Sequence, residues 1–506
     1  MEVAPGENQF MEGTGNPVRD SAAAAPAVVD ARPAVTPAVP LVVDLDGTLV
    51  ITDTLFENAA LLLRQRPWLI LSMVVWLFRG KAALKWEIAS RAHVKAEHLP
   101  FRPELVAWLQ SESDGGRRIV LATGAHQSTA DAVAAHLGIF SEVLATSDDL
   151  NLTGAAKRDA LVKRFGPGGF DYVGNGRDDV PVWMACRISH VAGRGHIPSA
   201  AALRGTSFSG PQTKLGSWVR AARPYQWVKN LLVFVPALLN HHVDFGILAN
   251  LVITFFAFSF TASGTYIAND LFDLESDRQH SRKRKRPLAS GELTITQGVL
   301  TVALLVAAGF GLGALMGTSL TIALFAYIFI SLGYSVFLKN KPILDVVALA
   351  FLYTLRVYTG GIVADASIST WLFQFSMFLF LSLAFVKRYS ELRRLRSLRK
   401  RDTPGRGYRL VDLALISQAG VGSGLLAGLI LALYADSQEI QRLYPHPQAL
   451  WCVCPIFVYW IVRVWIIAHR GNMTDDPILY AFRDRVSYIV GFAIVAAVVL
   501  AMMPNG

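Results

Sequence analysis

Hydrophobic residues are distributed in two different ways along this chain. Within residues 39–196, short apolar runs such as 41–43, 118–122 and 172–173 alternate with helical patterns. Such alternation predicts an α/β domain with a parallel, Rossmann-type sheet. Within residues 217–506, long apolar segments replace the short runs and predict an all-α membrane domain.

The second region predicts nine transmembrane helices, because its apolar segments approach the roughly 20 residues that a bilayer requires. The segments lie near 227–240, 247–268, 295–315, 319–338, 342–362, 370–386, 411–434, 448–468 and 485–503. Residues 197–216 are rich in Ser, Gly, Thr and Pro and predict a linker between the two domains. Residues 1–38 are rich in Ala and Pro and lack the apolar core of a signal peptide, so we expect a disordered tail.

A helical insertion at 55–99 interrupts the first domain and predicts a cap over the sheet. Its most apolar stretch, residues 67–78, is shorter than a membrane span. Two interpretations are open: a buried cap helix, or a helix pressed into the membrane interface. The membrane-interface interpretation is supported by four flanking cations, which are Arg64, Arg66, Arg79 and Lys81.

The loops between the apolar segments determine the expected orientation. Lys and Arg concentrate in the loops after the second, fourth, sixth and eighth segments, whereas the intervening loops carry only Arg442. Basic loops stay on the cytoplasmic side of a bacterial-type inner membrane. We therefore expect a cytoplasmic N-terminal domain and Gly506 on the opposite side.

Composition narrows the class of protein further. The chain of 506 residues is 53% hydrophobic, too apolar for one soluble protein, and its net charge of +10 lies mostly in the basic loops. We therefore expect no nucleic-acid partner, and no recognition motif for one is present. Three cysteines, Cys186, Cys452 and Cys454, imply no disulfide framework. The sequence leaves the oligomeric state open, a homo-oligomer included.

The first candidate for chemistry directly follows the first predicted strand, in the run Asp44-Leu45-Asp46-Gly47-Thr48. Gly47 permits the tight turn between strand and site. Here the chain resembles the haloacid dehalogenase-like phosphohydrolases over about residues 40–195. The resemblance implies that Asp44 attacks phosphorus and that Asp46 acts as general acid and base.

The resemblance extends to later residues in the family's order. It implies that Thr123 binds phosphate and that Lys157 neutralises a phosphorylated intermediate. It also implies a Mg²⁺ site formed by Asp44, Asn175 and Asp179. The family usually has an acid where this chain has Asn175, and an amide is a weaker ligand for a hard cation. Phosphatase activity and a docking role without activity both remain open.

The second candidate is an acidic cluster at the end of the second apolar segment. It comprises Asn269, Asp270, Asp273 and Asp277. On a continuous helix the three aspartates share one face. Carboxylates are costly near a membrane core, and Mg²⁺ binds such groups together with substrate phosphates. The cluster predicts a Mg²⁺ and phosphate site, with a solvated loop as the alternative.

The cluster is followed by Arg286-Pro287-Leu288-Ala289-Ser290-Gly291 and preceded by Arg223-Pro224 with Lys229 at the first segment. In these features the chain resembles the UbiA superfamily of intramembrane prenyltransferases over about residues 215–505. The resemblance implies nine helices, Mg²⁺, and phosphate ligands among Asn269, Lys229, Lys285 and Arg286. For the basic run, positive-inside topology alone is the competing explanation.

One departure from the usual pattern points to a branch of that superfamily. Typical members carry a second acidic motif after the sixth helix, where this chain reads Lys387-Arg388-Tyr389-Ser390-Glu391. Together with Lys339, this segment resembles the decaprenyl-phosphate phosphoribosyltransferases, which make a cell-wall precursor. That branch implies phosphoribosyl diphosphate as donor, a polyprenyl phosphate as acceptor, and Lys339, Lys387 and Arg388 as phosphate ligands.

These patterns together predict a phosphohydrolase-like domain fused to a membrane transferase. The first domain would remove the 5-phosphate from the phosphoribosyl lipid that the second domain makes. Ordinary prenyl transfer to an aromatic or other small acceptor, and a non-enzymatic scaffold or transporter, are the alternatives. For Asp345, Arg356 and Asp476, a structural ion pair or helix cap competes with a role in ligand binding.

Overall fold

The computed structural model of the chain describes residues 39–147, 151–193, 204–239, 244–366, 369–397, 407–473 and 476–503. The predicted tail, residues 1–38, lies outside this range.

The N-terminal domain is built on a parallel sheet of six strands in the order β3-β2-β1-β4-β5-β6. The strands are β1 (Leu41–Val43), β2 (Ile119–His126), β3 (Glu142–Thr146), β4 (Asp171–Gly174), β5 (Ser189–Ala192) and β6 (Arg204–Phe208). The predicted parallel α/β architecture is confirmed, with the three predicted strands at its centre as β1, β2 and β4.

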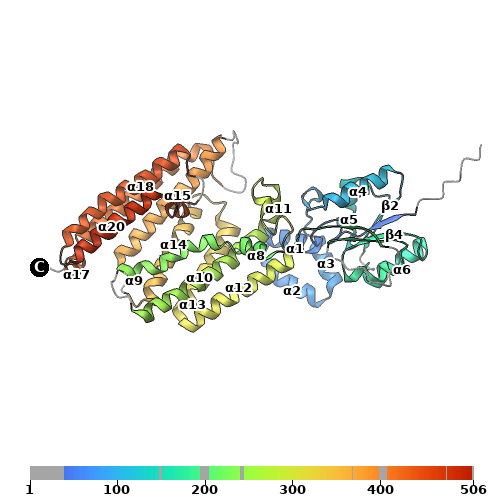
Figure 1. Cartoon of the computed structure of the whole chain (residues 1–506), viewed down its shortest axis with the longest axis horizontal. Helices are drawn as coiled ribbons and strands as arrows, with labels where there is room; N and C mark the ends of the chain where they lie inside the picture. The colour runs from blue at the N-terminus through green and yellow to red at the C-terminus, as the bar shows by residue number, and fades with distance from the viewer. Residues whose placement is uncertain are drawn as a thin grey trace, which may run out of the picture. The chain divides into compact units, whose positions relative to one another are not determined.

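Helices cover both faces of this sheet (Figure 1). Successive strand residues point to opposite faces, so Leu41 and Val43 share one core with α4 (Pro103–Asp114) and α5 (Gln127–Leu137). On the other face Val42 packs in a second core with α6 (Gly154–Phe165) and α7 (Val180–Trp183). The two cores fix the ends of β1 and β4, where the polar residues of the first candidate site begin.

The predicted linker is wrong at residues 204–208, which form strand β6 and pair in parallel with β5. Four of its five residues are exposed, and only Phe208 packs into the core. A strand at the sheet edge needs little hydrophobic sequence, because half of its backbone bonds and most of its side chains face water. Its Gly-Thr-Ser centre therefore has the composition of a loop.

The insertion between β1 and α4 forms the expected helical cap. It consists of α1 (Thr54–Gln65), a 3₁₀ turn (Pro67–Leu69), α2 (Ile70–Phe78), α3 (Lys81–Ala89) and a second 3₁₀ turn (Ala96–His98). Leu62, Trp76 and Ile88 form its small core. Through this core α2 is attached to α1 and α3.

The second domain is helical. Its long helices are α10 (Phe245–Phe272), α12 (Ile295–Met316), α13 (Thr318–Gly333), α14 (Leu344–Val363), α15 (Thr370–Ser397), α16 (Leu413–Ala435), α18 (Val453–Arg470) and α20 (Arg485–Met502). Shorter elements are α8 (Leu215–Ala222), α9 (Val235–Leu239), α11 (Leu274–Gln279), α17 (Gln438–Leu443) and α19 (Pro477–Ala481). Within the described residues, eight helical segments are long and apolar enough to cross a membrane.

The predicted first span, residues 227–240, is not among these eight. A 3₁₀ segment, Pro224–Phe234, runs into the short helix α9 instead. Lys229 and Asn230 within it are buried and bind other helices: Lys229 donates to Asp476 (2.8 Å), and Asn230 donates to Ser259 (3.0 Å) and accepts from Arg356 (2.8 Å). These polar groups attach the segment to α10, α14 and the chain just before α19.

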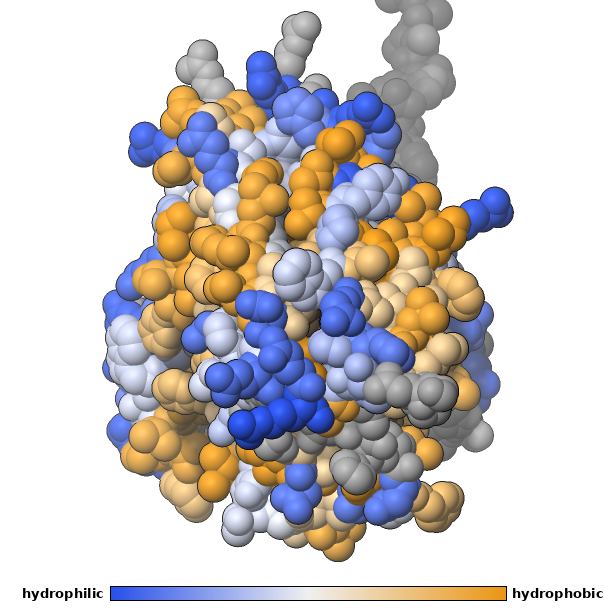
Figure 2. Space-filling view, turned by 90° about the vertical axis from the view of Figure 1, so that its left-hand side faces the viewer, coloured by the Kyte–Doolittle hydropathy of each residue, from blue (hydrophilic) through white to orange (hydrophobic). Residues whose placement is uncertain are grey.

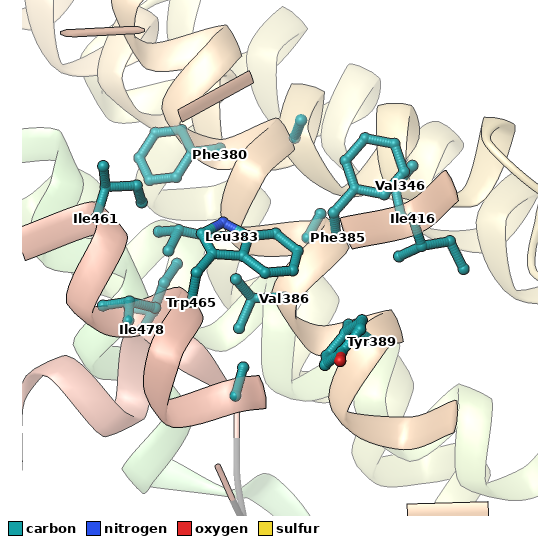
Figure 3. Close-up of a cluster of buried hydrophobic side chains, with 14 of the residues drawn as sticks. Val346, Phe380, Leu383, Phe385, Val386, Tyr389, Ile416, Ile461, Trp465 and Ile478 are labelled. Atoms are coloured by element: carbon teal, nitrogen blue, oxygen red, sulfur yellow. The ribbon is translucent and has the colours of Figure 1, made fainter. Parts of the chain in front are cut away.

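The largest core of the helical domain lies between α14, α15, α16 and α18. Figure 3 shows Trp465 of α18 reaching to the α15 side chains Leu383 and Val386. Its indole nitrogen donates to Ser382 (3.1 Å). On the outside the domain exposes many large hydrophobic side chains, and Figure 2 shows them on the face near α17. An exposed apolar surface of this extent suits lipid.

The cap and the helical domain also contact each other. Glu57 of α1 accepts from Arg278 of α11 (2.6 Å), and the two side chains are 3% and 8% exposed. Nearby, His98 Nδ1 lies 2.7 Å from a carboxylate oxygen of Glu275. A buried ion pair holds its two elements in one geometry, because separating them leaves each charge unpaired.

Candidate active sites

The first candidate site lies at the carboxyl ends of β1 and β4, where α/β sheets commonly bind ligands. Asp44 is buried and accepts hydrogen bonds from the Thr48 hydroxyl (3.0 Å) and the Lys157 ammonium group (2.7 Å). Lys157 also lies 3.5 Å from Asp179. The structure thus brings together the predicted nucleophile, the predicted cation and one predicted metal ligand.

Asp46 lies beside Asp44 and accepts from the backbone N–H of Thr54 (2.7 Å). Burial raises the pKa of Asp46 to about 7, and the neighbouring carboxylate of Asp53 raises it further. Burial also raises the pKa of Asp44, to about 6, while Lys157 acts in the opposite direction. A carboxyl group that stays protonated near neutral pH can serve as a general acid.

The loop after β4 is organised by Asp179. One carboxylate oxygen accepts from the backbone N–H groups of Asn175 (2.8 Å) and Gly176 (3.1 Å). The other accepts from the Tyr172 hydroxyl (2.5 Å). The Asn175 side chain packs against Gly47, where an added Cβ would lie 1.9 Å from Nδ2. Gly47 is therefore required for this contact as well as for its positive φ of 73°.

A cavity of about 350 Å³ opens between these residues and the cap. The predicted residues Asp44, Asp46, Lys157, Asn175 and Asp179 line it. Sequence reasoning missed its cap-side lining, which includes Asp53, Asn58, Lys85 and Ile88. These residues lie on a helical insertion whose pattern shows apolar packing but no motif.

Thr123, the predicted phosphate ligand of β2, is not itself part of the cavity lining. It is fully buried in β2, and its hydroxyl accepts from the backbone N–H of Ala125 (2.9 Å). The cavity is lined there by Gly124 and Ala125. This bond uses one acceptor lone pair and leaves the O–H available as a donor, so the phosphate-binding role of Thr123 stays a prediction.

The second candidate site lies at the junction of α10 and α11. Asp270 is buried and paired with Arg223 (2.5 Å) and Arg286 (2.9 Å), and Arg286 also donates to the buried Asp277. Asp273 pairs with Lys339 (2.8 Å). The predicted residues Asp270, Asp273, Asp277, Arg286 and Lys339 are therefore neighbours.

The predicted continuous helix through these acids is wrong. Asp273 is the C-terminal cap of α10, and α11 begins at Leu274. The break follows from three acids and an Asn in one short segment, because Asn and Asp compete with helical bonding. Asp273 consequently forms an ion pair with Lys339, while Arg286 binds both Asp270 and Asp277.

The donor set fits a divalent cation. Buried oxygens of Asn269 and Asp277 lack a hydrogen-bond partner in the described part of the chain. Burial raises the pKa of Asp277, so its surroundings do not fully compensate a negative charge. Carboxylate and amide oxygens are the ligands that Mg²⁺ prefers. Across the described residues no group of three or more His, Cys, Asp or Glu side chains is already arranged as a metal site.

A third cluster joins the 3₁₀ segment to the loop before α19. Asp476 accepts from Lys229 (2.8 Å), Lys387 (3.2 Å) and the Tyr353 hydroxyl (3.4 Å). Both lysines were predicted as phosphate ligands. For Asp476 the sequence leaves open a helix cap or a role in ligand binding. The structure shows the cap, because Asp476 accepts from the Ile478 N–H (3.2 Å) at the start of α19.

Two further predicted phosphate ligands, Arg388 and Lys285, lie in different surroundings. The Arg388 side chain is 1% exposed and is bound by Asp345, Glu391 (2.8 Å) and the Tyr334 hydroxyl (2.7 Å). Each of its three guanidinium nitrogens has a protein partner, as a buried charge requires. Lys285 is exposed at the end of a 3₁₀ turn, and Lys283 is the cation of that turn that approaches Asp277 (3.6 Å).

A cavity of about 570 Å³ lies beside the third cluster. Its charged lining is mostly basic and comprises Arg282, Lys387, Arg393, Arg394 and Arg470, with Glu391 and Asp476 as the acids. Sequence reasoning treated these arginines as topology signals. What distinguishes them is that the C-terminal turns of α15 and α18 and the chain at Arg282 meet at one cavity, and no local sequence pattern reveals that.

With this geometry established, the membrane domain can be classified. The UbiA prenyltransferase family matches residues 231–486, about half of the chain, and the haloacid dehalogenase-like hydrolases match residues 41–182. The chain belongs to the UbiA prenyltransferase family and carries a haloacid dehalogenase-like domain at its N-terminal side. It is an integral membrane protein, and the predicted fusion is confirmed.

Individual relatives refine this placement. The chain is 35% identical over 92% of its length to the "uncharacterized protein y4nM" of Sinorhizobium fredii, of which it covers 91%. It is 33% identical to the nodulation protein NoeC of Azorhizobium caulinodans, over 56% of this chain and 93% of that protein. It is also homologous to the decaprenyl-phosphate phosphoribosyltransferase of Corynebacterium glutamicum, at 33% identity over 36% of this chain and 56% of that enzyme.

Among solved structures, a UbiA homologue from Archaeoglobus fulgidus bound to GPP and Mg²⁺ is 19% identical, with a TM-score of 0.44. The match covers 56% of this chain and 99% of that structure.

Proposed function

We propose that the membrane domain transfers 5-phosphoribose from phosphoribosyl diphosphate to a polyprenyl phosphate. The observation that carries this proposal is the pair formed by an acidic, metal-suited cluster at α10 and α11 and a mostly basic cavity, which is lined by Arg282 just after α11 and by residues of α15 and α18. Phosphoribosyl diphosphate carries a diphosphate at one end of the sugar and a phosphate at the other. It therefore requires a metal-binding acidic site for the diphosphate and a basic site for the phosphate. Homology to the Corynebacterium glutamicum enzyme supports the same substrate class.

In the proposed reaction, Asp270, Asp273, Asp277 and Asn269 would hold Mg²⁺ at the donor diphosphate. Such a cation would supply positive charge against the departing diphosphate. Lys229, Lys387 and the arginines of the basic cavity bind the remaining phosphate groups. An oxygen of the acceptor phosphate attacks the anomeric carbon, the bond from that carbon to the diphosphate breaks, and diphosphate leaves.

The N-terminal domain would then remove the 5-phosphate from the product. Lys157 keeps Asp44 ionised, Asp44 attacks phosphorus, and Asp46 gives its proton to the departing sugar oxygen. The ionised Asp46 then takes a proton from water, which attacks the phosphorus bound to Asp44, so that inorganic phosphate leaves and Asp44 is restored. Mg²⁺ would be held by Asp44 and Asn175 and would lower the charge on the phosphate. Because both sites belong to one chain, the product meets the second site at high effective concentration.

The test uses the purified full chain in lipid nanodiscs with Mg²⁺, phosphoribosyl diphosphate and polyprenyl phosphate. Mass spectrometry should detect a phosphoribosylated lipid followed by its dephosphorylated form. Asp44→Asn should leave transfer intact and accumulate the phosphorylated lipid.

Asp273→Asn, which keeps the shape of a side chain that is 25% exposed, should reduce transfer by about 100-fold or more. Asp436→Asn, at an exposed position after α16, is the matched control. If the wild-type chain transfers only a prenyl group, from a prenyl diphosphate to a small acceptor, the phosphoribosyl proposal is wrong.

A further inference from the structure

Helix α2 carries apolar side chains on every side. Its inner face packs on the cap core through Met73 and Trp76, beside Leu69 of the preceding 3₁₀ turn. Its outer side chains are exposed, with Leu71 at 75% and Phe78 at 88%. Ile70, Val74, Val75 and Leu77 are exposed as well.

This pattern departs from a normal surface helix, which has a polar outer face. Helix α4 of the same domain follows the rule: Leu105 and Leu109 are buried, while Glu104 and Gln110 are exposed. Burying the apolar outer face of α2 away from water is therefore favourable. At 12 residues including the 3₁₀ turn, Pro67–Phe78 is too short to span a bilayer.

Cations flank both ends of the apolar surface. Arg64 and Arg66 precede it and are exposed, and Arg79 follows it. Arg79 pairs with Glu87 (3.3 Å) but its side chain remains 63% exposed. Apolar side chains between exposed arginines complement an anionic lipid surface, where acyl chains lie beneath charged headgroups.

The neighbours of α2 connect it both to the membrane domain and to the phosphate cavity. Helix α1, which precedes it, contacts α10 and α12. Helix α3, which follows it, carries Lys85 and Ile88 in the cavity wall, and Lys85 donates to the Gly124 carbonyl (2.8 Å).

We propose that α2 lies in the headgroup region of an anionic membrane, with Leu71, Val75 and Phe78 inserted among the acyl chains. The cap is thereby held at the lipid surface, and its cavity receives phosphate groups that remain attached to lipid. Insertion of α2 requires no phosphatase activity. Its test is therefore independent of the proposed function.

The experiment places a nitroxide label on the full chain in nanodiscs that contain anionic phospholipid. The label is attached at Phe78→Cys, in a chain that also carries Cys452→Ser and Cys454→Ser; Cys186 is buried and is retained. A second chain carries the label at Ala107→Cys on the exposed face of α4. Collisions with oxygen, which enriches in lipid, and with a water-soluble nickel chelate report the environment of each label.

We expect the label at 78 to collide several-fold more with oxygen than with the nickel chelate, and the label at 107 to do the reverse. Combining Arg64→Gln with Arg66→Gln should raise the access of the chelate to 78. The matched pair Lys163→Gln and Arg164→Gln, exposed on α6, should not change it.

Three results would overturn the proposal. In the first, the chelate reaches the label at 78 as freely as the label at 107, which means that α2 faces water. In the second, both reagents are excluded at 78, which means that protein, such as a second copy of the chain, covers α2. In the third, the label lies at equal depth in purely zwitterionic discs, which means that anionic lipid plays no part.

Discussion

At the scale of the residue, the protonation state of Asp46 decides whether the first site has a general acid. Its pKa of about 7 is raised by burial and by the carboxylate of Asp53. Asp53 is the N-cap of α1 and accepts from the Leu55 N–H (2.8 Å). Asn is an equally good N-cap, so the charge of Asp53 can be removed without loss of the cap.

The first prediction concerns pH. A general acid acts in its protonated form, so phosphatase activity should fall as pH rises through the pKa of Asp46. Asp53→Asn removes a negative neighbour, lowers that pKa, and should move the fall to lower pH. The measurement is kcat against pH with a soluble phosphate monoester. An unchanged profile in the variant would assign the titration to another group.

At the scale of elements, the break between α10 and α11 separates the roles of the three aspartates. Asp270 and Asp277 share Arg286, whereas Asp273 alone meets Lys339 at the end of the π-helical turn Tyr334–Leu338. That turn leads into α14. The pairing therefore connects the acidic junction to the next helix of the bundle.

The second prediction is that Lys339→Gln raises the KM for the phosphorylated donor by roughly tenfold, the worth of one charge-assisted hydrogen bond. The variant removes one cation but keeps a hydrogen-bond donor of similar reach. Steady-state kinetics on the nanodisc protein measure the effect. Lys341→Gln, at an exposed position two residues further on, should leave KM unchanged.

Elements of strong local pattern were predictable from the sequence. The β1 strand with Asp44 and Asp46, and the long apolar helices, carry signals within a few residues. Features that depend on distant partners were not predictable. Arg388 is predicted as a phosphate ligand, and only the fold reveals that Asp345 and Tyr334 bind its guanidinium. For the same reason the arginines of the basic cavity were read only as topology signals.

At the scale of the whole molecule, the sequence assigns the acidic junction and the N-terminal domain to the cytoplasmic side. The third prediction is that a reporter active only in the cytoplasm is silent when fused after Gly506 and active when fused after Arg401. The positive charge of the loops after α10 and α15 is the physical reason. Fluorescence of both fusions in intact cells measures it, and the opposite pattern would reverse the orientation.

The contact between Glu57 and Arg278 gives the fourth prediction. Glu57→Gln leaves Arg278 buried without a counter-charge, which typically costs about 3–5 kcal/mol. Hydrogen exchange of α1 and α11 in the nanodisc protein should therefore increase. Exchanging the charges, by Glu57→Arg with Arg278→Glu, should restore part of the protection. Equal exchange in all three proteins would mean that the pair does not hold the domains together.

The buried Lys229 and Asn230 also constrain the order in which the protein can assemble during synthesis. Lys229 binds Asp476, 247 positions later, and Asn230 binds Arg356, 126 positions later. When the ribosome releases this segment, neither partner exists, and a lone ammonium group in lipid is strongly unfavourable. The first segment of the bundle to be made therefore reaches its final position among the last, after the chain around Asp476 has emerged.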